Sequence, residues 1–342
     1  MRIRALIITA LLAVAGVAAA APAVAANDKV TVAALRFVST GPLFIARDQG
    51  YFEAEGIDAD FQFFNAAQPV AVAIASGDAD FGVTAFTAGF FNIASQGALQ
   101  VVAAQLHEVQ GFEGSAILAS NQAYENGLRS VGDLPGHSVA ITQTGSSFHY
   151  MIGKIAEDVG FSLDEVQLRP LQSVGNMIGA LRSNQIDSVM IVPHIAKPLI
   201  EAGDAQLIGW VSDHVPYQVG GLFTSTHNVE RETDMVRRFV RAYQRGVDDY
   251  RAAFIDGDEA MREQVVAILH NYVYHDEDAE SAYPKILNGA MYITEGAALN
   301  VEDVAEQVRW YQATGHVNAR ADAADFISTE FVEVIGQPDP IE

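Results

Sequence analysis

Residues 30–50 read VTVAALRFVSTGPLFIARDQG, and this stretch decides the fold class. Its first six residues are β-branched or apolar, which predicts a strand. A turn carrying Gly41 and Pro42 follows, and the apolar period beyond it predicts a helix that ends at about Gly50. The stretch is therefore a strand, a loop and a helix, the building block of a sheet that is covered by helices.

The same unit repeats directly afterwards. Residues 57–64 predict a second strand, and residues 65–68 a polar loop. Pro69 then stands where the first turn of a helix tolerates proline, and the helix is expected to reach Ser76. Residues 80–83 predict a third strand. Repeated units of this length predict an α/β fold with mainly parallel sheets, in which ligands bind outside the carboxyl ends of the strands.

A second series of units begins after residue 114. Strands are predicted at residues 115–119, 138–141, 166–168 and 186–192, and helices at 148–159 and 176–183. Residues 217–223 are interpreted as the return to the first series. One series inserted into the other predicts two lobes, joined by two crossings, with a hinged cleft between them. The expected boundaries are 26–113 for the first part of lobe 1, 114–220 for lobe 2, and 221–342 for the second, mainly helical part of lobe 1 with a C-terminal tail.

The N-terminus predicts export from the cytoplasm. Residues 1–25 carry Arg2 and Arg4, then an apolar run, then the small-residue cleavage site Ala23-Val24-Ala25, which together indicate a signal peptide. A permanent membrane anchor is the alternative interpretation. Because no later run approaches about 18 apolar residues, the mature chain from near Ala26 is expected to be periplasmic and soluble, without direct membrane insertion.

The net charge and the absence of cysteine exclude several classes of binding partner and site. The chain has 20 Lys and Arg against 43 Asp and Glu, a net charge of −23 at pH 7, and no cysteine. The negative charge argues against nucleic acid or anionic lipid as a partner. The absence of cysteine excludes disulfides, thiolate metal sites and a lipidated cysteine after the signal peptide.

The chain offers no familiar catalytic or metal-binding motif. The acidic runs at residues 256–259 and 275–278 lack the ligand spacing of a calcium loop. His107-Glu108 lacks the second histidine of a zinc-protease motif, and there is no phosphate loop, nucleophile elbow or dinucleotide fingerprint. We therefore expect no metal, no cofactor and no catalytic residue.

Four motifs in order carry a resemblance to a known family. They are GPLFIA at residues 41–46 with GYFEAEGI at 50–57, ASGDADFGV at 75–83, DLPGHSVA at 133–140, and Gly145-Ser146 with His149. Over residues 28–315 the chain resembles the nitrate, sulfonate, taurine and thiamine-precursor substrate-binding proteins of ABC importers. The resemblance implies the type II periplasmic binding protein fold, with a small-molecule ligand held between the lobes.

The resemblance also implies which loops touch the ligand, namely those at residues 36–41, 64–68, 84–87 and 144–149. A strand end followed by a helix presents unpaired backbone N–H groups, and Gly145 would let a ligand oxygen approach them. The expected ligand-binding residues are Arg36, Phe37, Ser39, Thr40, Gly41, Asn65, Thr84, Ala85, Phe86, Thr144, Gly145, Ser146, Ser147, Phe148, His149, His194 and Tyr217.

Several of these side chains have a second interpretation. Arg36 is a candidate clamp for a ligand acid group, or it forms a salt bridge across its loop. His149 donates to a ligand oxygen or packs its helix. His194 lies in the cleft or on the surface, and it stands where the family often has an acidic residue, which disfavours amine-bearing ligands such as taurine. The aromatic side chains in these loops favour a planar or apolar ligand, although most such residues belong to cores.

The leading interpretation is a monomeric transport receptor rather than an enzyme. It would bind a small organic solute, anionic or aromatic, such as a carboxylate, sulfonate or heterocycle, and deliver it to the membrane permease of an ABC importer. One alternative is an enzyme on the same fold, a pyrimidine-synthase-like protein or a lyase, although the resembling synthase carries a cysteine cluster that this chain lacks. The other is a ligand-presenting sensor protein.

Overall fold

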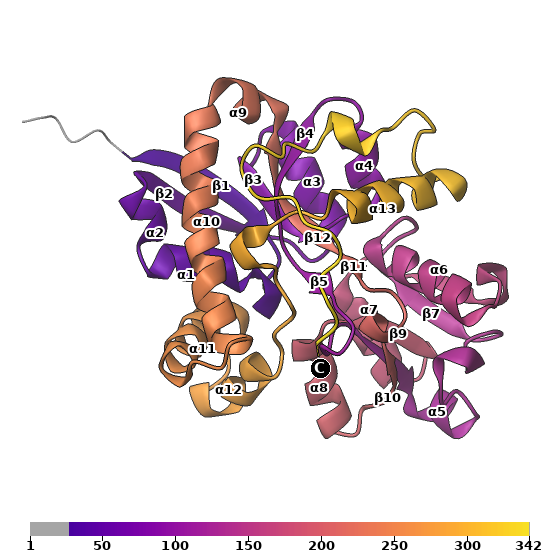
Figure 1. Ribbon diagram of the computed structural model, residues 1–342. Helices are drawn as coiled ribbons and strands as arrows, with labels where there is room; N and C mark the ends of the chain where they lie inside the picture. The colour runs from indigo at the N-terminus through magenta and orange to yellow at the C-terminus, as the bar shows by residue number, and fades with distance from the viewer. Residues whose placement is uncertain (1–26, 342) are drawn as a thin grey trace, which may run out of the picture.

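The computed structural model describes residues 27–341 (Figure 1). The predicted signal peptide at residues 1–25 lies outside the described residues. Between residues 27 and 341, no helix is both long enough and apolar enough to cross a membrane.

Five strands form the first sheet, in the order β2-β1-β3-β12-β4. Strands β1 (Asp28–Ala34), β2 (Ile57–Phe63) and β3 (Phe81–Ala85) pair in parallel. Strand β12 (Gly220–Ser225) is antiparallel both to β3 and to β4 (Leu99–Ala104). Four strands of this sheet therefore run in one direction, and the reversed strand is the one that returns from the other half of the molecule.

The second sheet repeats this plan in the order β10-β6-β9-β7-β8. Strand β7 (Ser138–Ile141) is parallel to β8 (Gln167–Pro170) and to β9 (Ser188–Ile191). Strand β6 (Ala116–Ser120) is antiparallel to β9 and to β10 (Ala205–Trp210). The predicted strand at residues 138–141 is confirmed at both ends, whereas the one at 186–192 is shorter because Pro193 begins a helix there.

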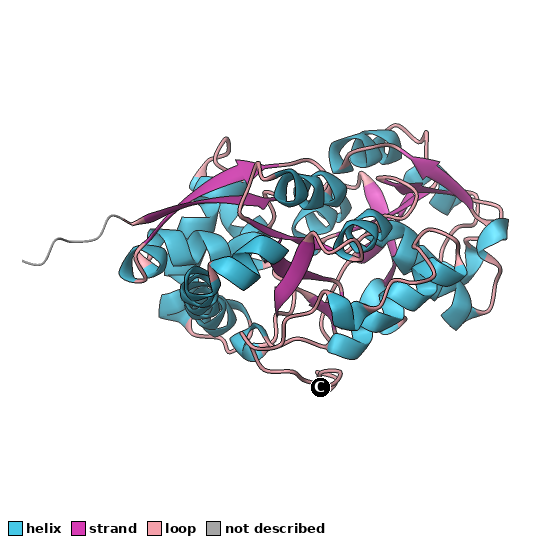
Figure 2. Cartoon of the chain, turned by 90° about the horizontal axis from the view of Figure 1, so that it is seen from above, coloured by secondary structure: helices cyan, strands magenta, loops and turns pink. Residues whose placement is uncertain are grey.

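Helices cover both sheets, and the two sheets with their helices form two lobes (Figures 1 and 2). The first lobe carries α1 (Gly41–Asp48), α2 (Tyr51–Ala54), α3 (Ala67–Ser76), α4 (Ala88–Ala94), α9 (Thr226–Arg231), α10 (Thr233–Phe254), α11 (Glu259–Val273) and α12 (Ala279–Leu287). The second carries α5 (Asn121–Glu125), α6 (Ser147–Val159), α7 (Val174–Arg182) and α8 (Pro193–Glu201). Helix α13 (Val301–Ala313) contacts both α4 and α6. The predicted α/β fold, with two lobes built on mainly parallel sheets, is confirmed.

Helix α10 shows how the sequence fixes this packing. Its buried residues Val236, Phe239, Val240, Tyr243 and Val247 recur at helical spacing and form one apolar face. The ring of Phe239 stacks on that of Phe81 in β3, with 3.8 Å between ring centroids. The helix is therefore held against the first sheet by its sequence pattern alone.

Two segments of the chain cross between the lobes, and a short strand on one forms a β-ladder with a short strand on the other. Strand β5 (His107–Glu108) lies on the first crossing and β11 (Tyr217–Gln218) on the second, and the two are antiparallel. All four of these residues are buried. The sheets place the changes of lobe between residues 104 and 116 and between 210 and 220; the finer boundaries at 113/114 and 220/221 stay a prediction.

Candidate functional site

A cavity lies where the carboxyl ends of strands from both sheets meet. The centres of water molecules can occupy a volume of about 50 Å³ in it. This is room for roughly three to five water molecules. The cavity is lined by Leu35, Phe37, Thr40, Ala66, Ala67, Val83, Thr84, Ala85, Gln105, Leu106, Ser115, Thr142, Ser147, Phe148, Met151, Val174, Val192 and Val219.

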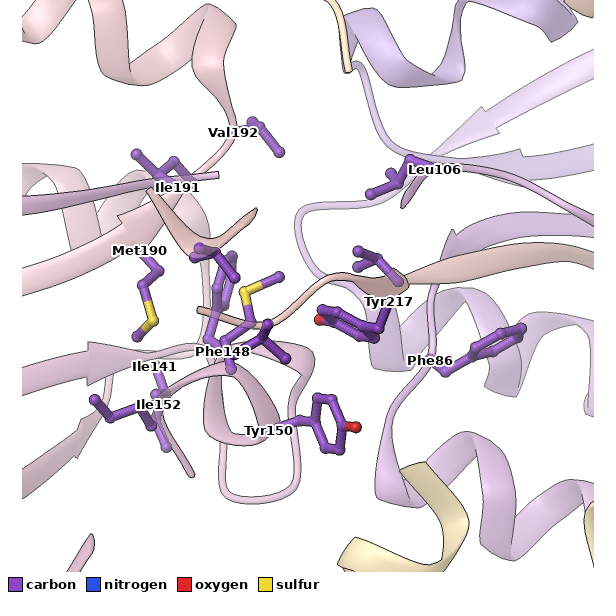
Figure 3. Packing of buried hydrophobic residues seen from close by; sticks show 14 of the residues in the cluster. Phe86, Leu106, Ile141, Phe148, Tyr150, Ile152, Met190, Ile191, Val192 and Tyr217 are labelled. Carbon is purple, nitrogen blue, oxygen red and sulfur yellow. The ribbon is translucent and has the colours of Figure 1, made fainter. Parts of the chain in front are cut away.

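The first lobe supplies one wall from four successive strand ends. Phe37 follows β1, Ala66 follows β2, Ala85 ends β3, and Gln105 follows β4. The second lobe supplies the other wall, chiefly from α6 with Phe148. Figure 3 shows Leu106 on one side of this region and Phe148 and Val192 on the other. Most of the lining is apolar, so the cavity favours an apolar surface on its occupant.

The sequence positions α6 through its first turn. Gly145 has a φ of +79°, the left-handed region that glycine adopts without strain, and so turns the chain after β7. The side chain of Ser146 then accepts a hydrogen bond from the backbone N–H of His149 and caps the helix. This turn places Ser147 and Phe148 against the cavity.

Three hydrogen bonds connect the walls beside the cavity. The backbone N–H of Ala88 donates to the carbonyl oxygen of Gly145 over 2.8 Å. The Tyr311 hydroxyl donates to the carbonyl oxygen of Ser146 over 2.8 Å, and the Trp310 indole N–H donates to Glu157 over 2.9 Å. The two lobes are thus in direct contact.

No charged side chain lines the cavity. Among residues 27–341 there is also no cluster of three or more His, Asp or Glu side chains placed to hold a metal ion. The polar groups of the lining are the hydroxyls of Thr40, Thr84, Ser115, Thr142 and Ser147 and the amide of Gln105. The cavity can therefore form hydrogen bonds, but it supplies no counter-charge to a buried ion.

Arg36 lies at the edge of the site, in an adjoining hollow that shares Leu35, Phe37 and Val174 with the cavity. Its guanidinium lies 3.8 Å from the centroid of the Phe63 ring and donates to the carbonyl oxygen of Tyr272 over 2.8 Å. Asn65 lines the same hollow. The positive charge therefore stands in this hollow beside the cavity, which we call the mouth.

His149 does not line the cavity. Its Nδ1 accepts a hydrogen bond from the Gly145 N–H over 3.0 Å, and its ring meets the rings of Trp310 and His316 edge-on. Burial, together with the nearby His316, lowers the pKa of His149 to about 4. The ring is therefore neutral at pH 7, and it packs α6 against α13, the second of its two predicted roles.

His194 is buried rather than on the surface. It is 2% exposed, its ring lies 5.1 Å from that of Phe37, and its Nδ1 has no hydrogen-bond partner among the described residues. Burial lowers its pKa to about 3. His194 thus supports Phe37 from behind and is absent from the lining of the cavity.

The cavity brings together six of the residues that the sequence predicts, and Arg36 and Asn65 lie in the hollow beside it. The predicted Phe86 instead packs with Phe90 and Phe91, and Tyr217 packs against Tyr150. Thr144 is exposed. The six residues in the lining are Phe37, Thr40, Thr84, Ala85, Ser147 and Phe148, and the predicted residues that lie in neither lining are Ser39, Gly41, Phe86, Thr144, Gly145, Ser146, His149, His194 and Tyr217.

Sequence reasoning missed Gln105 and Leu106. They directly follow β4, whose residues 99–104 read LQVVAA and end at the same sheet edge as β1 and β3. The strand rule that located the first three strands would have found this one. The other missed residues, such as Val174 and Val219, carry no signal in the sequence that separates them from core residues.

One protein-family model and one curated relative match much of the chain. The NMT1/THI5-like family model matches residues 38–253. A curated protein of Brucella abortus strain 2308, described as a binding protein, is 26% identical over 201 residues, which is 58% of this chain and 55% of the relative. The alignment thus spans about half the length of that relative.

The similar solved structures share the fold. The alkanesulfonate-binding protein of Xanthomonas axonopodis pv. citri, bound to MOPS, has a TM-score of 0.71 and 17% identity, covering 89% of this chain and 99% of the other. The periplasmic nitrate-binding protein of Synechocystis PCC 6803 has a TM-score of 0.68 and 10% identity, covering 87% and 84%. At such identities the likeness establishes the fold alone, and it confirms the predicted periplasmic binding protein fold.

Proposed function

The chain belongs to the NMT1/THI5-like family, and from that premise we propose that it is the periplasmic solute-binding component of an ABC importer. It binds a small organic solute between its lobes and presents the closed form to a membrane permease. The observation that carries this proposal is the cavity built from strand ends of both lobes, since only closure of the hinge completes it.

The contacts across the cleft support a closing motion. Ala88 and Gly145 are joined through main-chain atoms, and α13 bridges the lobes through Trp310 and Tyr311. A ligand that touches both walls stabilises this arrangement by its differential affinity for the closed state. The binding proteins among the similar structures have the same architecture.

The ligand class follows from the two parts of the site. The apolar lining with Phe37 and Phe148 suits an aromatic or aliphatic body. Arg36 at the mouth suits an acid group, because its planar fork matches a carboxylate or sulfonate. We therefore propose a solute whose apolar part enters the cavity and whose acid group, when it has one, stays near Arg36.

Trp310 provides the test. The chain has two tryptophans, Trp210 and Trp310, so a Trp210→Phe protein reports only on Trp310, which is buried between the lobes. Sulfonates, aromatic carboxylates, pyrimidines and nitrate are each added to the purified protein. A true ligand raises the melting temperature by mass action and shifts the Trp310 emission to shorter wavelength.

The same experiment separates a receptor from an enzyme. A receptor returns the solute unchanged after prolonged incubation, whereas an enzyme consumes it. Uptake of the identified solute by cells with and without the gene then distinguishes transport from sensing. If no solute shifts both the melting temperature and the Trp310 emission, the binding function is wrong.

A further inference from the structure

We infer that the enclosed end of the cavity selects an uncharged hydrogen-bond donor on the solute, and that Gln105 is the residue that recognises it. This inference rests on the proposed function, because it names the chemistry of the group that the cavity encloses. It concerns the group of the solute that lies inside the cavity rather than the acid group near Arg36.

Gln105 is a buried polar side chain without a full set of partners. It follows β4, is 3% exposed, and lines the cavity. Its Oε1 has no hydrogen-bond partner among residues 27–341. A buried acceptor left unsatisfied destabilises the protein, and nearly all buried polar atoms in folded proteins avoid this state. The cavity is the open side of this residue, so the missing donor belongs to the occupant.

The orientation of the amide follows from its other contact. The Nε2 of Gln105 donates to the carbonyl oxygen of Ser39 over 3.4 Å. Turning the amide over would place Oε1 against that carbonyl oxygen, and two acceptors would then face each other. Oε1 is therefore the atom left for the occupant. The Ser39 hydroxyl, also buried and without a partner, adds a second polar group on this side.

This end of the cavity offers no counter-charge to an anion, and the nearest buried ionisable group is an acid, Glu108. Its carboxylate is fully buried and accepts hydrogen bonds from the backbone N–H of Ser115 over 3.0 and 3.1 Å. Ser115 lines the cavity, so an acid lies directly behind the wall, while no Lys, Arg or His belongs to the lining. A buried anion would have neither counter-charge nor solvent here. A cation would also lack a direct partner, because no carboxylate belongs to the lining.

The test uses matched probes that differ only in this group. Propionamide, butanone and propionate each have five non-hydrogen atoms, and present a donor, no donor and a negative charge. Benzamide, acetophenone and benzoate form the corresponding aromatic trio. Affinities are measured by calorimetry and by thermal shift. Both amides are expected to bind about three- to tenfold more tightly than the ketones, and the acids more weakly still.

Three variants on β4 and its end assign the effect. Gln105→Met keeps the length of the side chain and removes Oε1, so the amide preference should disappear. Gln100→Met is the matched control, because Gln100 lies on the same strand but contacts Asp325 and Ser328 outside the cavity. Gln105→Glu, with a protonated carboxyl group that donates to the Ser39 carbonyl oxygen, retains an acceptor and should keep the amide preference. This third variant tests the inference should Gln105→Met fail to fold.

Each outcome either supports or overturns the role of Gln105. Loss of the amide preference in Gln105→Met, with the preference intact in Gln100→Met, supports the inference. Acids that bind as tightly as amides, an unchanged preference in Gln105→Met, or no binding of either amide would overturn it. The binding function survives these results if another solute shifts the Trp310 emission, so the two proposals fail separately.

Discussion

The backbone N–H of Ala88 donates to the carbonyl oxygen of Gly145, and a β-carbon placed on Gly145 would lie only 2.8 Å from that of Ala88. Ala88 begins α4 of the first lobe and Gly145 precedes α6 of the second. The lobes therefore approach each other so closely here that only glycine fits. This single contact is a sensitive point for closure.

Gly145→Ala should weaken ligand binding. The added methyl group would push the two lobes apart and reduce the population of the closed form, so the affinity for any ligand should fall about tenfold or more. Gly160→Ala is the matched control: its φ of +89° carries the same backbone strain, but a β-carbon there has no atom within 4 Å. Equal affinities in the two variants, measured by calorimetry, would show that the contact does not govern closure.

Glu108→Gln should stabilise the protein at high pH. Burial raises the pKa of Glu108 from 4.5 to about 7. The folded state therefore holds the proton more tightly, and this residue's contribution to stability falls as pH rises from 4.5 to 7. Glutamine avoids that loss, so the variant should gain about 1–3 kcal/mol over the native protein at pH 8 and little at pH 4.5.

Urea unfolding at both pH values checks this prediction, since differences between variant and native protein cancel the titration of all other groups. Glu125→Gln, at an exposed position, is the control and should show no such pH dependence. A stability gain at pH 8 no larger than that at pH 4.5 would contradict a buried, protonated Glu108.

Arg36→Ala should weaken the binding of solutes with an acid group and leave the binding of other solutes unchanged. The guanidinium stands at the mouth, outside the cavity. Its removal should weaken a two-headed probe such as 4-carbamoylbenzoate about tenfold, because a charge-assisted hydrogen bond is lost, while benzamide keeps its affinity. Calorimetry with both probes provides the measurement. An equal loss for both probes would mean that Arg36 acts on the structure of the loop instead.

Phe148→Ala should alter the size of solute that binds. Phe148 lines the cavity from α6, so its truncation enlarges the site and should raise the affinity for benzamide relative to propionamide. The cost in stability is about 3–5 kcal/mol. Phe90→Ala should carry a similar cost without changing this ratio, because Phe90 is buried outside the cavity. Ratios measured by thermal shift that change equally in both variants would refute the assignment.

Much of the fold could be predicted from local pattern. The strand at residues 138–141 and the helix that ends at Val159 follow from period and from the glycine after it. The motif GPLFIA and the three motifs that follow it indicated the family. The match over residues 38–253 establishes that family. The cleft at the strand ends follows from the parallel plan of each sheet. These features depend on near neighbours in the chain, so the sequence reveals them.

Which individual side chains face the cavity was harder to predict from the sequence. Each strand-end loop carries several residues, and any of them can face the ligand when the loop is considered alone. Arg36 and Phe37 are adjacent, yet only Phe37 reaches the cavity. His149 packs against Trp310 of α13, which lies more than 150 residues later in the chain, and local sequence does not indicate such a contact.

The amino-acid sequence by itself therefore determined the two-lobed fold and the loops that form the cleft, because periodicity and turn residues act over short distances. Only the folded chain shows that no charged side chain among residues 27–341 lines the cavity, that Arg36 lies at its mouth, and that the Oε1 of Gln105 has no partner among those residues. Those properties depend on how one lobe closes on the other, and that contact joins residues far apart in the chain.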